Sequence, residues 1–121
     1  MKLNFKPGKN IAIKVPIEKY EATVKFYSDI IGLPLKLKKS NSVMFKFGEI
    51  NLWIDRMEKV EKTEVWFEIQ TDNTEEAKNY FQLTNIERKD EIEELPLEFD
   101  GFWISNPAGV IHLITNEEDE I

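Results

Sequence analysis

The feature that most constrains the fold is a change of hydrophobic period that occurs twice along the chain. Residues 10–15 alternate apolar and polar side chains, as a half-buried strand does, and Pro16 ends this stretch. From about residue 18 the apolar side chains recur at helical spacing until Gly32 and Pro34 give a stop signal. Strand-like alternation then returns in three short stretches, at residues 35–37, 43–47 and 50–55. The first half therefore predicts a strand, a helix and three strands.

The same order follows a charged connector at residues 56–63. Residues 65–70 alternate like a strand, and Asp72 or Thr74 is placed to cap a short helix. Three further features complete this half: a helical stripe at Ala77, Tyr80 and Phe81, an edge strand near residues 86–92, and a hairpin with strands at residues 102–105 and 110–115. The sequence Asn-Pro-Ala-Gly between the last two strands is strong turn chemistry.

Two consecutive β-α-β-β-β units predict an α+β protein in which each helix covers one face of a mixed sheet. With 121 residues, of which 41% are hydrophobic, the chain is long enough for one domain and too short for two independent ones. We expect the units, about residues 10–55 and 64–115, to form one pseudo-twofold, cup-shaped domain over residues 1–121. The more polar face of each sheet would then line a cleft.

The candidate ligand-binding residues are the polar and aromatic side chains on the strand faces that would line this cleft. They are Asn10, Lys14, Asn51, Trp53, Asp55, Trp66, Glu68, Gln70 and His112. His112 is the only histidine of the chain, and it shares one strand face with Val110 and Ile114.

Composition and charge exclude several classes of function. The chain has no cysteine, which rules out disulfides, thiolate nucleophiles and cysteine-bound metals. A net charge of −7 opposes binding to a phosphate backbone, so we expect no nucleic-acid partner. We expect a cytoplasmic protein with no membrane partner, because no apolar stretch resembles a signal peptide or a membrane span. The acidic run at residues 117–120 predicts a solvated tail.

Three motifs, in their order and spacing, resemble the vicinal oxygen chelate superfamily, which includes glyoxalase I, the bleomycin-resistance proteins and the extradiol dioxygenases. The motifs are IAIKVPIEKYEATVKFYSDIIGLPL, EVWFEIQTDN and NPAGVIHLI, and together they extend from about residue 10 to residue 115. The resemblance implies a homodimer, with the two units paired either within one chain or across the dimer. The fold hosts isomerases, oxygenases, lyases and simple binding proteins, so it does not fix the activity.

The resemblance also indicates where a metal ion would be bound. The positions that supply metal ligands in metal-dependent members fall on Asn10, Asn51, Trp66 and His112. An indole has no lone pair to give, and amides are poor ligands for borderline divalent ions, which leaves His112 as the one good ligand. Recruiting Glu68 gives only two ligands, whereas three or more are normally needed. The sequence therefore predicts that no metal cofactor is used.

Two functional hypotheses remain open. The first is metal-independent binding of a small organic molecule, with Trp53 and Trp66 as aromatic walls. Asp55 and Glu68 would then favour a flat cationic ligand. The second is a lyase, an isomerase or a dioxygenase, with an atypical metal site or with His112 and Glu68 as acid and base. The first and fourth strands of a unit are neighbours in this fold, so we expect Trp66 to flank His112 and Glu68 to lie diagonally near it.

The same residues also have purely structural interpretations. His112 can be a packed histidine that lines a pocket, and tryptophans often fill space where two sheets meet. We expect Trp103 in particular to be a packing residue. Acidic side chains on strands, such as Asp55, are commonly solvated at the rim of a sheet.

Overall fold

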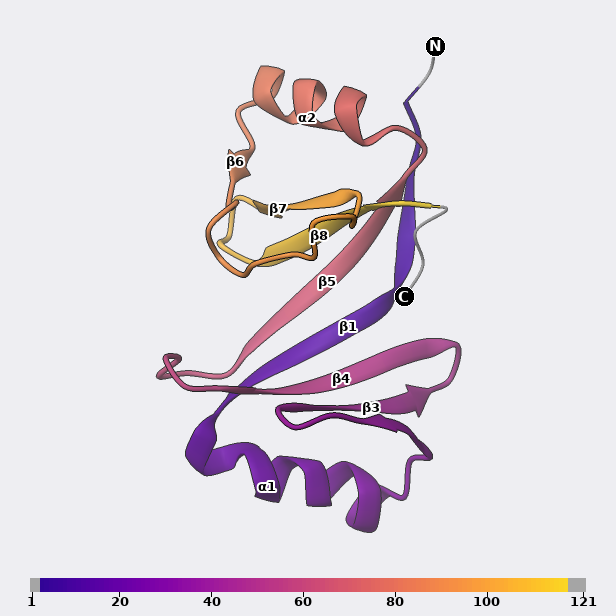
Figure 1. Ribbon diagram of the computed structural model, residues 1–121, viewed down its shortest axis with the longest axis vertical. Coiled ribbons are helices and arrows are strands. Elements are labelled where there is room, and N and C mark those ends of the chain that lie inside the picture. Colours follow the sequence, from indigo (N-terminus) through magenta and orange to yellow (C-terminus); the bar gives the residue numbers. More distant parts are fainter. Residues whose placement is uncertain (1–2, 118–121) are drawn as a thin grey trace. The chain divides into compact units, whose positions relative to one another are not determined.

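In the computed structural model, which describes residues 3–117, the chain is an α+β protein with eight strands and two α-helices (Figure 1). Its two compact units are Lys9–Trp66, called here the central unit, and Met1–Gly8 with Phe67–Ile121, called the terminal unit. The predicted tail lies outside the described residues from residue 118 onward. No helix in the described part of the chain is long and apolar enough to span a membrane.

The central unit contains the predicted strand, helix and three further strands. The elements are β1 (Phe5–Pro16, which begins in the terminal unit), α1 (Ile17–Lys25), its π-helical continuation η1 (Phe26–Ile31), β2 (Leu35–Lys38), β3 (Ser42–Phe47) and β4 (Ile50–Met57). The strand order is β2-β3-β4-β1, with β1 and β4 parallel and the other pairs antiparallel. Gly32 ends the helix as predicted, because it adopts a left-handed φ of 82° and donates its N–H to the Tyr27 carbonyl.

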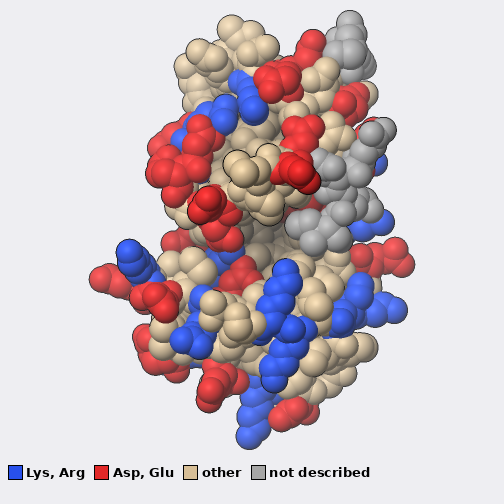
Figure 2. All heavy atoms as spheres, viewed as in Figure 1, with Lys and Arg blue, Asp and Glu red and all other residues tan. Residues whose placement is uncertain are grey.

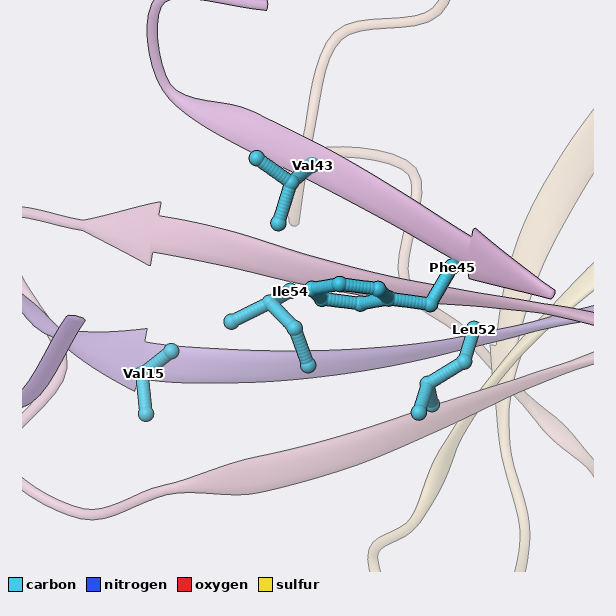
Figure 3. Close-up of a cluster of buried hydrophobic side chains, with 5 residues drawn as sticks. All are labelled: Val15, Val43, Phe45, Leu52 and Ile54. Atoms are coloured by element: carbon cyan, nitrogen blue, oxygen red, sulfur yellow. The ribbon is translucent and has the colours of Figure 1, made fainter. Parts of the chain in front are cut away.

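One face of this sheet carries the hydrophobic core of the central unit. Its buried members come from β1, β3 and β4: Val15, Val43, Phe45, Leu52 and Ile54 (Figure 3). Tyr20, Val24 and Tyr27 pack against them, as the helical spacing predicts, whereas Ile31 at the end of the same stripe is exposed. Because side chains alternate along a strand, the intervening residues of β1 and β4 lie on the face turned away from α1.

The terminal unit follows the same plan with a very short third strand. Its elements are β5 (Glu64–Thr71, which begins in the central unit), α2 (Thr74–Leu83), β6 (Glu87–Arg88), β7 (Gly101–Ser105) and β8 (Ile111–Asn116). The strand order is β5-β8-β7-β6, with β5 and β8 parallel. The buried core consists of Ala77, Phe102, Ile104 and Ile114. Of the edge strand predicted near residues 86–92, only Glu87–Arg88 pairs with β7.

The hairpin predicted from its turn chemistry is confirmed as β7 and β8. The side-chain oxygen of Asn106 accepts hydrogen bonds from the N–H groups of Ala108 and Val110, each at 2.9 Å. Trp103, which we expected to be a packing residue, is buried. Its indole Nε1 donates to the Glu93 carbonyl at 2.9 Å, so its polar atom is satisfied within the unit.

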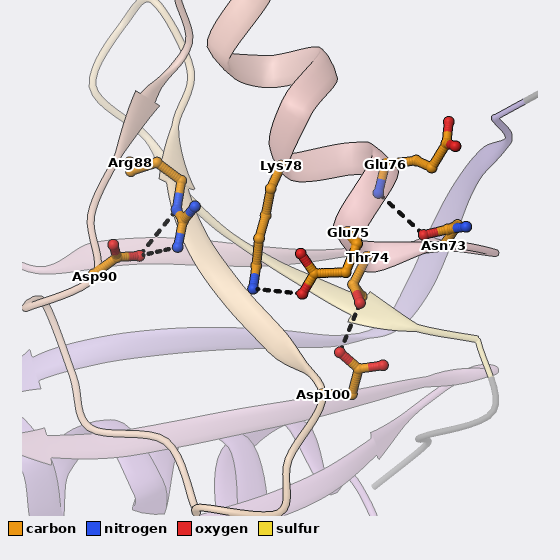
Figure 4. A network of polar contacts seen from close by, with 8 residues as sticks. All are labelled: Asn73, Thr74, Glu75, Glu76, Lys78, Arg88, Asp90 and Asp100. Atoms are coloured by element: carbon orange, nitrogen blue, oxygen red, sulfur yellow. Dashed lines mark hydrogen bonds and ion pairs between the residues drawn. The ribbon is translucent and has the colours of Figure 1, made fainter.

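The N-cap of α2 corrects a prediction, because the capping residue is Asn73 and not Asp72 or Thr74. Asn73 has an extended backbone, and its Oδ1 accepts the Glu76 N–H at 3.0 Å (Figure 4). Thr74 instead donates its hydroxyl to Asp100 at 2.7 Å, and Asp72 accepts from Asn4. All three residue types can cap a helix, so only the backbone conformation decides among them.

Candidate functional site

The face of the central unit turned away from α1 brings together five of the predicted site residues. They are Asn10 and Lys14 on β1, and Asn51, Trp53 and Asp55 on β4, and together they are called the polar face below. The parallel register places Asn10 beside Asn51 and Lys14 beside Asp55. The sequence predicted that these residues share one face, and the register shows which of them are neighbours.

Asn10 is the centre of the first hydrogen-bond network on the polar face. Its side-chain oxygen accepts from Asn51 Nδ2 at 3.2 Å and from Trp53 Nε1 at 2.8 Å. Lys36, on the edge strand β2, donates its ammonium to the Asn51 Oδ1 at 3.0 Å. These bonds fix the orientation of both amides and of the indole before any ligand arrives.

Lys14 and Asp55 form the second network. Lys14 Nζ lies 2.6 Å from Asp55 Oδ2, and the other carboxylate oxygen accepts from the Ser42 hydroxyl. The exposed fraction of the side chain is 4% for Lys14 and 19% for Asp55. A buried charge needs such pairing, because removing it from water costs several kcal/mol. Asp55 is therefore an internal counter-ion and not the solvated rim charge that its sequence position also allowed.

Both tryptophan rings of the central unit already contact lysine ammonium groups. Lys14 Nζ lies 4.2 Å from the ring centroid of Trp66, and Lys39 Nζ lies 5.2 Å from that of Trp53. The Trp66 indole N–H donates to Glu64 at 3.0 Å. The rings and the Asp55 carboxylate that were expected to attract a cationic ligand therefore already meet the chain's own cations.

Glu68 and Gln70 lie in the terminal unit, on one face of β5. Both side chains are buried, and the Glu68 carboxylate accepts from the Thr115 hydroxyl at 3.2 Å. A side chain at Gly8 would overlap Glu68, so this position requires the close approach that only glycine permits. Glu68 is held in a packed polar environment within its own unit.

The predicted neighbours of His112 are corrected by the strand register. Phe67, and not Trp66, is the partner of His112 across the parallel pair β5 and β8. The two rings stack with their centroids 5.5 Å apart and an interplanar angle of 28°. Glu68 follows Phe67 in the strand, so its side chain lies on the opposite face and does not form the acid–base pair with His112.

His112 has the contacts of a packed histidine. Its Nδ1 lies 3.0 Å from the Val110 carbonyl oxygen, which can only accept, so Nδ1 carries the proton. Together with the Phe67 stack this contact fixes the ring. Phe67 was not predicted as a neighbour, and only the register between β5 and β8 could have identified it.

The residues at the metal-ligand positions of the resembled family do not fit a metal ion. Asn10 and Asn51 are hydrogen-bonded to each other, Trp66 offers only an N–H donor, and His112 stacks on Phe67. Within residues 3–117 no three acidic or histidine side chains converge as a metal site requires. We therefore derive no chemistry through a metal from these residues.

Three polar residues of the central unit contact the polar face although they were not predicted as site residues. They are Lys36, Lys39 and Ser42, from β2, β3 and the turn between them. The alternation at residues 35–37 predicted a strand there, but a register shift between Leu35 and Leu37 decides the direction of the side chains. No pattern in the sequence predicts that register shift.

Comparison with known proteins identifies the fold. No protein-family model matches the sequence, and no curated protein matches it. Among solved structures, the Mn(II)-bound glyoxalase from Novosphingobium aromaticivorans is similar with a TM-score of 0.71 and 14% identity, over 96% of this chain and 40% of that chain. A glyoxalase/bleomycin resistance protein/dioxygenase superfamily member from Vibrio splendidus 12B01 is similar with a TM-score of 0.64 and 13% identity, over 88% of this chain and 97% of that chain.

A homoprotocatechuate 2,3-dioxygenase from Arthrobacter globiformis is similar with a TM-score of 0.62 and 19% identity. The match covers 94% of this chain and 36% of the dioxygenase. This chain thus spans well under half the length of the glyoxalase and of the dioxygenase. At these identities the likeness establishes the shared architecture and leaves activity open. The chain therefore has the vicinal oxygen chelate fold, that of the glyoxalase/bleomycin resistance/dioxygenase superfamily.

Proposed function

We propose that this chain binds a small organic molecule at the polar face of the central unit without using a metal ion. The observation that carries the proposal is the network of Asn10, Asn51 and Trp53, whose amide and indole groups are fixed by mutual hydrogen bonds. A ligand that meets groups already in position loses less conformational entropy on binding, which raises its affinity. A small number of oriented polar groups beside aromatic surface is the usual composition of a ligand site.

The charges around the polar face favour a flat ligand that carries an anionic group, such as a carboxylate. Lys36 and Lys39 are exposed, and both contact members of the polar face. The sequence between residues 9 and 66 has eleven Lys and Arg against eight Asp and Glu, so the central unit is basic within an acidic chain. A cationic ligand would meet like charge from both lysines.

An enzymatic alternative with His112 and Glu68 as acid and base has less support. The two side chains lie on opposite faces of the sheet of the terminal unit. The metal-dependent alternative is supported by the structural similarity to the Mn(II)-bound glyoxalase. The donor atoms at the corresponding positions of this chain favour hydrogen bonding to an organic ligand over coordination of such an ion.

The test is a fluorescence titration with three aromatic probes of equal size: 2-naphthoate, 2-naphthalenemethanol and 2-naphthylmethylammonium. We expect the anion to bind best and the cation worst. Replacing both lysines, in Lys36→Met/Lys39→Met, should weaken naphthoate binding by roughly fivefold, since an exposed charge pair contributes up to about 1 kcal/mol. Binding of the neutral alcohol should change much less.

Lys59→Met/Lys62→Met is the matched control, because it removes the same charge from the exposed connector between β4 and β5. The proposed anion preference is contradicted if the cation binds best or if the control variant weakens naphthoate binding equally.

Thermal melting of the protein with Mn(II), Fe(II), Ni(II) or Zn(II) tests whether the chain binds a metal ion. A ligand at 100 times its dissociation constant adds about 2.7 kcal/mol, so a clear stabilisation that disappears in Asn10→Ala/Asn51→Ala would overturn that part of the proposal.

A further inference from the structure

The edge strand β2 carries a β-bulge that turns its two leucines to opposite faces of the sheet of the central unit. Leu35 pairs with Phe45 of the hydrophobic core, so it lies on the core face. The register then shifts, and Leu37 pairs with Met44, which is itself the partner of Trp53 on β4. Opposite residues of an antiparallel pair have their side chains on the same face. Leu37 therefore lies on the face of Trp53, whereas regular alternation would place it beside Leu35.

The register of the central unit gives this face one row of apolar side chains. The row runs across the strands from β1 to the edge strand β2, and it consists of Ala12, Trp53, Met44 and Leu37, called the apolar row below. Its exposure rises toward the edge, since Trp53 is buried, Met44 is half-buried and Leu37 has an exposed fraction of 39%. Among the described strands β2 pairs only with β3, so no strand of that part of the chain closes the row beyond Leu37.

Two lysines meet at Asn51, in the row of side chains next to the apolar row. Lys46 is the partner of Asn51 across β3 and β4, and such partners have Cβ atoms about 5 Å apart. Lys36 donates its ammonium to the Asn51 Oδ1 at 3.0 Å. Both lysines are exposed, and Figure 2 shows Lys and Arg side chains gathered over the visible face of the central unit. Residues two apart on a strand are separated by about 7 Å, so these cations and Met44 lie within reach of one aromatic carboxylate.

We propose that the ligand of the polar face is an amphiphilic carboxylate, in which an aromatic ring carries an alkyl tail. This inference rests on the proposed ligand-binding function and specifies the class of its ligand. The carboxylate binds between Lys36 and Lys46, and the ring lies against Met44. The tail follows the apolar row over Leu37 and leaves the sheet at β2. Methionine adapts to different shapes and the row has no closing strand, so tails of different length are accepted.

The bulge allows one ligand to meet both the charge and the apolar surface. In a regular strand the consecutive residues Lys36 and Leu37 would point to opposite faces. Here the ammonium of the first contacts Asn51, and the second pairs with Met44 on the same face. Bulges that re-aim side chains in this way are common next to functional sites.

The first experiment measures how affinity depends on the length of the tail. The probes are benzoate and its para-butyl, para-hexyl and para-octyl derivatives, titrated by calorimetry below the concentrations at which they form micelles. Each methylene that leaves water on the apolar row should strengthen binding by about two- to fourfold. We therefore expect octylbenzoate to bind at least tenfold more tightly than butylbenzoate. The neutral para-octylbenzyl alcohol should bind more weakly than octylbenzoate, because it lacks the carboxylate.

The second experiment separates recognition of the tail from recognition of the carboxylate. Leu37→Ser should remove most of the gain from butyl to octyl and leave butylbenzoate binding nearly unchanged, whereas Leu37→Met should keep the gain. Leu35→Ser is the matched control, because Leu35 is a leucine of the same strand with an exposed fraction of 52%, but it lies on the other face. Lys36→Met should weaken butylbenzoate and octylbenzoate by the same factor, up to about fivefold.

Three results would overturn the inference. The first is octylbenzoate that binds no more tightly than butylbenzoate. The second is a gain from the longer tail that persists in Leu37→Ser, and the third is an equal loss of that gain in Leu35→Ser. Binding of butylbenzoate that depends on Lys36 would in each case still support the proposed function. If neither benzoate nor any of its derivatives binds the folded protein, the proposed function itself is contradicted, and the inference with it.

Discussion

Lys14 and Asp55 form a buried ion pair between neighbouring parallel strands, with 2.6 Å between the ammonium nitrogen and Oδ2. The Lys14 ammonium also makes a cation–π contact with Trp66, and Asp55 accepts a second hydrogen bond from Ser42. The lysine is the more buried partner, because the exposed fraction of its side chain is 4% against 19% for Asp55. This asymmetry predicts that the two residues respond differently to substitution.

Asp55→Ala should cost about 3 kcal/mol of unfolding free energy, because it removes the carboxylate that lies against the buried Lys14 ammonium. Lys14→Met should cost less, about 1 to 2 kcal/mol, since the remaining carboxylate keeps the Ser42 donor and some contact with water. The double variant should lose less than the sum of the two single variants. Urea denaturation measures all four proteins. Equal costs for the single variants, or strict additivity, would contradict this account.

Asn10→Ala should destabilise the central unit by about 1 to 3 kcal/mol, because Asn51 and Trp53 both lose an acceptor in a partly buried network. Asn10→Asp keeps an acceptor oxygen and should be less harmful. The matched control is Asn79→Ala on the exposed side of α2, which should change the stability by less than about 0.5 kcal/mol. Thermal melting followed by tryptophan fluorescence measures both effects. If the Asn10→Ala protein is as stable as the control variant, the hydrogen-bond network of Asn10 contributes nothing to stability.

His112→Phe should leave both the fold and naphthoate binding nearly unchanged. A phenyl ring can keep the stack on Phe67, and the loss is limited to the contact between Nδ1 and the Val110 carbonyl. His112→Ala should be the more destabilising variant, because it also removes the stacking surface. Melting and probe titration of the two variants provide the measurement. Loss of probe binding in His112→Phe, with the melting temperature preserved, would give this histidine a direct functional role.

Asp72 makes a pH-dependent contribution to stability. The Asn4 backbone N–H, donated to one oxygen at 3.2 Å, and the Asn4 side-chain amide hold the pKa of Asp72 below its ordinary value of 3.8. A lowered pKa in the folded state favours folding above the unfolded pKa, and this contribution is lost as pH falls through the folded pKa. The wild type should therefore be more stable than Asp72→Asn at neutral pH, and the difference should shrink below about pH 4.

Thermal melting of the two proteins from neutral to acidic pH measures this difference. Glu98→Gln removes an exposed carboxylate elsewhere in the terminal unit and provides the control. If the difference in melting temperature between the wild type and Asp72→Asn grows as the pH falls, the pKa of Asp72 is shifted in the direction opposite to the one assigned here.

The sequence by itself determined the order of the elements and much of the core of the central unit. Alternation along residues 10–15 placed Val15 on the apolar side, and helical spacing placed Tyr20 and Val24 against it, as the structure confirms. The stop at Gly32 and the turn before β8 followed from local backbone preferences. These features could be predicted because each depends on a few neighbouring residues.

Only the tertiary structure decided which side chains of the candidate site are neighbours. The Lys14–Asp55 pair and the Phe67–His112 stack depend on the register between strands that are more than 40 residues apart in the sequence. A register shift of one residue moves every side chain of a strand to the other face. The His112 neighbours were therefore predicted wrongly although β5 and β8 were both predicted as strands. Register is set by the simultaneous packing of both faces, and that information is not contained in any single stretch of the sequence.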